Sequence, residues 1–179
     1  TSFESIVVSV GGAECFAKAF VEQERKTLES DTMKTAFTEF KKVKNYIDKG
    51  APGRDRNVAT PMVIKGEAAM QFMGDWAKGE FSAANKQPGV DYYCVPFPGT
   101  DNAFTFNIDS LAMFKQNNAE NEKAQMKMAE LVVSPKFQET FNLNKGSIPV
   151  RLDQDMSPFD ACAIASMDTF KSTAKSGNG

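Results

Sequence analysis

The sixteen residues from Gly66 to Phe81 constrain the fold of this chain more than any other segment. A short apolar stretch, Ala68 to Met73, predicts a buried strand that ends at Gly74. Asp75 then fits a helix N-cap, because its carboxylate can accept from the first free backbone N–H groups. Trp76, the sole tryptophan, follows at the carboxyl end of this strand, which is where open α/β sheets bind ligands. A flat apolar ring at this corner suits stacking on a sugar, and the alternative is a packing residue of the core.

Composition indicates one globular domain and excludes several classes of partner. The chain has 179 residues, of which 41% are hydrophobic and 25% charged, enough for a single core. A net charge of −2 argues against a nucleic-acid partner, which needs a concentrated basic face. No apolar run approaches the roughly 20 residues of a membrane span. We find no signal peptide at the start, and both ends read as cuts in a longer protein.

The sequence contains no histidine, which removes the commonest general base and metal ligand. A Ser-His-Asp or Cys-His system therefore cannot be built from this chain. Three cysteines, Cys15, Cys94 and Cys162, show no C-x-x-C spacing, so a zinc site is not expected. We also expect no cofactor. Their spacing leaves two alternatives open, either one disulfide with a free thiol or three reduced cysteines.

Helix signals recur along most of the chain. A stripe of apolar residues at helical spacing, from Met33 through Phe37 and Phe40, predicts a long helix that begins at Ser30-Asp31 and faces a core. The other expected helices cover residues 3–10, 13–24, 58–64, 76–85, 119–132 and 135–145, with a last one that begins at Ser157-Pro158. Strands are expected at 68–73, 92–95 and 104–108.

The run from Phe104 to Phe114 places polar and apolar side chains on opposite faces of an extended backbone. Asn107 and Asp109 share the polar face. The amide both donates and accepts hydrogen bonds and the carboxylate accepts them, so the pair can hold adjacent sugar hydroxyls. The alternative is a turn in which both side chains bond to the backbone.

Four segments together carry a resemblance that spans the chain in order: GEAAMQFMGDWAKGEF, YYCVPFPGT, FTFNIDSLAMF and NLNKGSIPVR. They resemble the sugar-binding proteins of bacterial ABC transporters, most closely the periplasmic glucose/mannose-type proteins. The resemblance implies an α/β lobe like those of type II periplasmic binding proteins, helix-rich with a small mixed sheet. It implies that residues 1–179 form a single lobe, chiefly the C-terminal one, incomplete at both ends, and that an N-terminal lobe is missing.

The same resemblance implies a function and a site. Trp76 matches the aromatic residue that stacks on the sugar ring, and Asn107, Asp109 and Lys145 match residues that bond its hydroxyls. The implied role is to bind a monosaccharide, a glucose-like aldohexose, in a cleft and deliver it to a membrane permease from the periplasm. No enzymatic activity is implied. The resemblance also implies a disulfide between Cys94 and Cys162, with Cys15 left over.

Two other functions remain as alternatives. A sugar-sensing lobe that signals through a chemoreceptor or a kinase would share the same binding residues. A glycoside-processing enzyme would need two carboxylates about 5–9.5 Å apart across a sugar. Asp75, Glu80 and Asp109 are the candidates for such a pair, but none lies in a distinctive catalytic motif.

Overall fold

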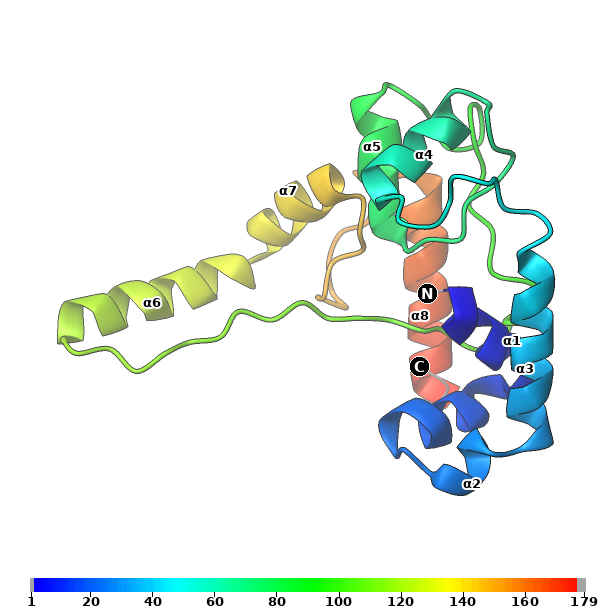
Figure 1. Cartoon of the computed structure of the whole chain (residues 1–179). Helices are drawn as coiled ribbons and strands as arrows, with labels where there is room; N and C mark the ends of the chain where they lie inside the picture. Colours follow the sequence, from blue (N-terminus) through cyan, green and yellow to red (C-terminus); the bar gives the residue numbers. More distant parts are fainter. Residues whose placement is uncertain (1, 177–179) are drawn as a thin grey trace.

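The computed structural model describes residues 2–176, so Thr1 and residues 177–179, the ends of the predicted lobe, lie outside the description. Figure 1 shows α6 and α7 extending to one side of the other helices. The described elements, in chain order, are the helices α1 (Ser2–Phe16), the π-helix η1 (Ala17–Val21), α2 (Arg25–Leu28), α3 (Asp31–Val43), α4 (Arg56–Ile64), the 3₁₀ helix η2 (Asp75–Ala77), α5 (Lys78–Ala83), α6 (Ala119–Val132), α7 (Pro135–Lys145) and α8 (Ala161–Ser176).

Three of the helix starts lie where the sequence predicted them. The side chains of Ser30, Asn118 and Ser134 accept hydrogen bonds from the backbone N–H three residues on, at 3.2, 2.7 and 3.3 Å. Each bond satisfies one of the N–H groups that a helix start leaves without a partner. These caps confirm the predicted beginnings of α3, α6 and α7.

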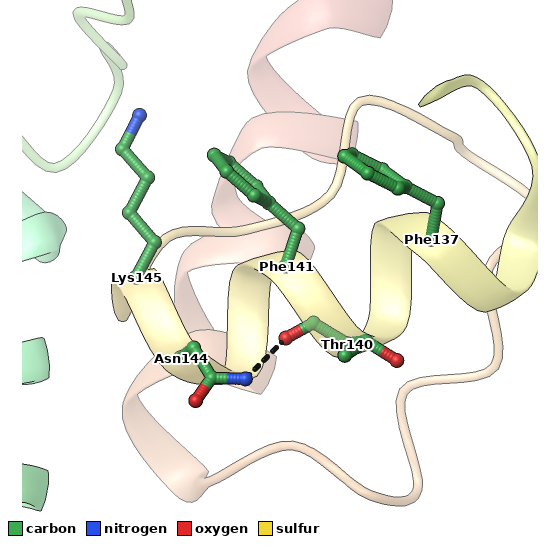
Figure 2. A pocket seen from close by; sticks show the side chains of 5 residues that line it. All are labelled: Phe137, Thr140, Phe141, Asn144 and Lys145. Atoms are coloured by element: carbon green, nitrogen blue, oxygen red, sulfur yellow. Dashed lines mark hydrogen bonds between the residues drawn. The ribbon is translucent and has the colours of Figure 1, made fainter. Parts of the chain in front are cut away.

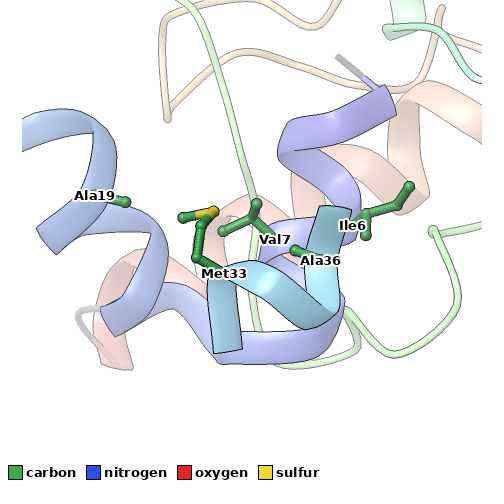
Figure 3. Close-up of a cluster of buried hydrophobic side chains, with 5 residues drawn as sticks. All are labelled: Ile6, Val7, Ala19, Met33 and Ala36. Atoms are coloured by element: carbon green, nitrogen blue, oxygen red, sulfur yellow. The ribbon is translucent and has the colours of Figure 1, made fainter. Parts of the chain in front are cut away.

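The main hydrophobic core lies between α1 and α3. Its buried members are shown in Figure 3 and consist of Ile6, Val7, Ala19, Met33 and Ala36. The predicted core-facing stripe of α3 is only partly correct. Met33 is 3% exposed, whereas Phe37 and Phe40 are 57% and 41% exposed. The reason is that α1 covers only one edge of the stripe, where the Phe3 ring meets both phenylalanines.

The second packing centre joins α5 to α8 through a partly buried ion pair. Lys78 Nζ lies 2.8 Å from both carboxylate oxygens of Asp160, and the Lys78 side chain is 6% exposed. Asp160 also accepts from the Ala163 N–H at 2.8 Å, so it caps α8. The prediction that the last helix begins at Ser157 was wrong, because Ser157 instead bonds to Asp155 in a turn.

A disulfide joins Cys94 to Cys162 on α8, with their Cα atoms 5.7 Å apart and a separation of 68 positions in sequence. This is the pair that the family resemblance implied. Cys15, at the end of α1, carries the free thiol among the three cysteines. The Tyr92 ring, two residues before Cys94, packs on Phe81 of α5 at 4.2 Å, so the disulfide and α5 hold the same short segment.

The predicted small mixed sheet is absent from residues 2–176, while the predicted helix-rich character is confirmed. One isolated bridge, between Pro88 and Tyr92, is the nearest approach to strand pairing that the structure describes. The segments 68–73, 92–95 and 104–108 carry strand-like patterns, but among the described residues no other segment forms a ladder with them. An alternating pattern favours extended backbone, and a strand also needs a neighbour that supplies hydrogen bonds.

The disulfide leads to a stability prediction. Replacing both Cys94 and Cys162 with alanine should lower the free energy of unfolding by about 2–4 kcal/mol, because the open chain gains conformational freedom. Urea unfolding measures this change, and Cys15→Ala is the matched control. A count of reactive thiols in denatured, unreduced protein should give one thiol; a count of three would contradict the pairing.

Candidate functional site

Trp76 occupies the middle of η2, between Gly74 and α5. Gly74 lies directly against its ring, since a Cβ at Gly74 would come within 2.1 Å of the ring carbons. The indole Nε1 is buried and has no hydrogen-bond partner among the described residues. A buried N–H without an acceptor costs free energy, so this donor lowers the stability of the η2 corner.

Asp75 has a different role from the helix N-cap that the sequence predicted. Gly74 is the N-cap residue of η2, and no side chain caps this helix. The Asp75 carboxylate instead accepts from the Ile148 N–H at 3.1 Å, which ties η2 to the segment after α7. Burial raises the pKa of Asp75, while that hydrogen bond and the nearby charge of Lys78 act in the opposite direction.

Trp76 borders a cavity of about 200 Å³ between α4, η2, α5 and the end of α7. Its lining combines an aromatic ring, a hydroxyl and two charged groups, a mixture typical of sites for small polar ligands. The residues that line it are Thr60, Met73, Trp76, Ala77, Gly79, Glu80 and Lys145. Two predicted sugar contacts, Trp76 and Lys145, therefore share one cavity although 69 positions separate them.

The other two predicted contacts form a polar chain that leads to Lys145. Lys145 Nζ lies 2.6 Å from Asp109 Oδ2, and Asn107 Nδ2 donates to Asp109 Oδ1 at 3.0 Å. The ammonium group of Lys145 lowers the pKa of Asp109, with the Asn107 amide adding to the effect, so the carboxylate stays ionised. Asn107 and Asp109 thus bond to side chains, in contrast to the backbone-bonded turn considered as the alternative.

A close approach between two glycines fixes the position of Lys145. Gly146 ends α7 in the left-handed conformation, with φ at 87°. A Cβ at Gly146 would lie 2.5 Å from the Gly79 backbone nitrogen, and a Cβ at Gly79 would lie 2.8 Å from the Lys145 carbonyl oxygen. The absence of side chains at both positions lets α7 end against α5, which brings Lys145 beside Trp76. Neither glycine was predicted from the sequence to take part in the site.

A second, more open hollow of about 500 Å³ lies along α7 and shares Lys145 with the first cavity. Figure 2 shows its lining: Phe137, Thr140, Phe141, Asn144 and Lys145. Apart from Lys145, these residues were not predicted from the sequence to take part in binding.

No cluster of three or more histidine, cysteine or acidic side chains suited to a metal ion occurs within residues 2–176. Among the same residues, none of the helices has the length and apolar character needed to cross a membrane.

Comparison with known proteins identifies one matching family and several similar proteins. The family model described as bacterial extracellular solute-binding protein matches residues 4–139. A "Probable sugar-binding periplasmic protein" of Brucella suis is 48% identical over 162 residues, which is 90% of this chain and 38% of that protein. A protein of the same name from Mesorhizobium japonicum is 45% identical over 177 residues, 99% of this chain and 42% of its own length.

A more distant relative is the xylose/arabinose-binding protein XacG of Haloferax volcanii, 35% identical over 116 residues, which is 63% of this chain and 24% of that protein. The chain therefore spans about two fifths of the length of the two sugar-binding relatives from Brucella and Mesorhizobium.

The glycine contact leads to a prediction with a matched control. Gly146→Ala and Gly66→Ala both place a side chain at a positive φ, but a Cβ at Gly66 meets nothing within 4 Å. Gly66→Ala should lower the free energy of unfolding by about 1–2 kcal/mol. Gly146→Ala should cost roughly 1–3 kcal/mol more, because its Cβ meets backbone atoms. Equal losses in urea unfolding would show that α5 and α7 do not touch here.

The raised pKa of Asp75 predicts a dependence of stability on pH. Because the folded state holds the proton of Asp75 more tightly than the unfolded state does, ionised Asp75 opposes folding at neutral pH. Asp75→Asn should therefore unfold at a higher urea concentration than the wild type at pH 7. Its advantage should shrink as the pH falls toward the ordinary value of 3.8, where the wild-type carboxyl becomes neutral.

The control for this experiment is Asp101→Asn, which removes one exposed carboxylate elsewhere. A lower stability of Asp75→Asn at pH 7 would mean that attraction to Lys78 and Lys145 outweighs the cost of burial.

Proposed function

The chain belongs to the bacterial extracellular solute-binding proteins, and from this premise we propose that residues 1–179 form the C-terminal lobe of a two-lobed protein that binds a sugar. Membership places the chain in a family of extracellular binding proteins rather than enzymes, and it implies the periplasmic-binding-protein fold. The proposal extends this by assigning a ligand class, a set of contacts and a second lobe that completes the site.

The observation that carries the proposal is the connection of all four predicted contacts through Lys145. Its side chain lines the cavity beside Trp76 and also pairs with Asp109, which holds Asn107. A glucose-like aldohexose would place the apolar face of its ring on Trp76. Its hydroxyls would then meet the Lys145, Asp109 and Asn107 groups at the edge of the cavity.

The charges of this group suit hydroxyl recognition. A sugar hydroxyl that leaves water must recover both a donor and an acceptor, which the Lys145 ammonium and the Asp109 carboxylate supply. Hydrogen bonds to charged groups contribute about 1.5–3 kcal/mol each, and a hydroxyl of inverted configuration would leave one of these groups without its bond. The Asp109–Lys145 pair therefore accounts for both affinity and discrimination among aldohexoses.

The location and the partners follow from the same proposal. The relatives from Brucella and Mesorhizobium are named periplasmic, and the Cys94–Cys162 disulfide suits an oxidising compartment such as the periplasm. We expect the N-terminal lobe to close over Trp76 by a hinge motion, which buries the sugar and strengthens its hydrogen bonds. The closed form would then deliver the sugar to an ABC transporter permease.

The fluorescence of Trp76, the sole tryptophan, tests the sugar site directly. We expect a saturable change with one of D-glucose, D-galactose and D-mannose. Asp109→Asn should weaken this binding by about ten- to a hundredfold, because one charged hydrogen bond is lost. Asp101→Asn, in the same connecting segment but outside the cavity, should bind as the wild type does.

The titration is made on the chain and on a fusion in which the N-terminal part of the Mesorhizobium relative precedes it. Absence of any change in both proteins would contradict the sugar site. Equal binding by the wild type and Asp109→Asn would remove Asp109 from it.

A further inference from the structure

Glu80 adds a carboxylate to the cavity beside Trp76. It lies four positions after Trp76, across the junction of η2 and α5, and both residues border the cavity. The preceding residue, Gly79, lies against the Lys145 backbone, so Glu80 and Lys145 reach the cavity from two helices that touch. Glu80 is partly buried, and its carboxylate forms no hydrogen bond or ion pair within the described part of the chain. This group is therefore available to a ligand.

The charge of Glu80 is in excess at this cavity. Lys145, the one cation among the described residues that line it, already pairs with Asp109 at 2.6 Å. Lys78, at the start of α5, pairs with Asp160 at 2.8 Å. Each of these ammonium groups thus has its own carboxylate, and Glu80 is left as an uncompensated negative charge. In a cavity of about 200 Å³, any charge on the ligand lies within a few ångströms of it and interacts with it strongly.

We propose that Glu80 determines the charge class of the sugar that this cavity accepts, an inference that rests on the proposed function. Its carboxylate accepts a hydrogen bond from a hydroxyl or ammonium group of the ligand and repels a ligand carboxylate. The ligand class is a neutral or amino aldohexose, and the corresponding sugar acid is excluded. Specificity of this kind uses a repulsive element in the site as well as attractive contacts.

Three sugars that differ in charge test this inference. Isothermal calorimetry of the chain and of the Mesorhizobium fusion compares D-glucose, D-glucosamine and D-glucuronate, or the matching derivatives of whichever aldohexose the Trp76 titration selects. The measurement is made at about pH 6, where the sugar amine is charged. D-glucuronate should bind at least about tenfold more weakly than D-glucose, because Glu80 repels it, and D-glucosamine should bind at least as tightly as D-glucose.

Two variants separate the charge of Glu80 from its shape. Glu80→Gln keeps the size of the side chain and should bring the affinity for D-glucuronate within about threefold of that for D-glucose, because the repulsion is lost. Glu80→Asp keeps the charge and should still reject D-glucuronate. The matched control is Glu130→Gln, which removes an exposed carboxylate on α6 and should leave all three affinities unchanged. Urea unfolding of each variant shows whether the fold is intact.

Two results would overturn the inference and leave the proposed function standing. One is a wild-type protein that binds D-glucuronate as tightly as D-glucose. The other is a folded Glu80→Gln variant that still rejects D-glucuronate, since shape rather than charge would then exclude the acid. Absence of binding by every sugar, in the chain and in the fusion, would contradict the proposed function itself.

Discussion

The ion pair between Lys78 and Asp160 is the interaction on which the arrangement around the site depends. Lys78 begins α5 directly after the helix that carries Trp76, and Asp160 caps α8. One carboxylate therefore both neutralises a buried ammonium and starts a sixteen-residue helix. Loss of one partner would leave a charge without compensation, at a cost below the roughly 3–5 kcal/mol of a fully buried pair, because the Asp160 side chain is 32% exposed. With no sheet described in residues 2–176, such contacts between distant helices hold the Trp76 corner in place.

Local sequence signals predicted local structure well. Ser30, Asn118 and Ser134 correctly predicted where three helices begin, because a cap depends only on the next three residues. Sequence patterns whose structural outcome depends on distant residues predicted the structure less well. The alternation at 104–108 favoured a strand, but strand formation needs a neighbouring segment. The role of Lys78 was not predicted, since nothing near it in sequence reveals a partner 82 positions away.

The candidate site shows the same division. Asn107 and Asp109 were identified as a pair from their spacing, and the structure places them in contact. The approach of Lys145 came only from the family resemblance, because it depends on the backbone contact between Gly79 and Gly146. Neither glycine carries a signal beyond turn or helix-end preference. The role of Asp75 likewise depends on Ile148, which lies 73 positions further along the chain. The contact between Asp75 and Ile148 could not be predicted from the sequence around either residue.

The disulfide determines how proteolytic cleavage of the chain would be detected. The connection that leads to α6 carries exposed side chains such as Leu111 and Phe114, and it lies between Cys94 and Cys162. Exposed connections outside regular structure are preferred sites of proteolytic cleavage. A single cut there leaves the two fragments covalently joined. A nicked molecule would therefore migrate with the intact chain's mass in a denaturing gel, and the fragments would separate only after reduction.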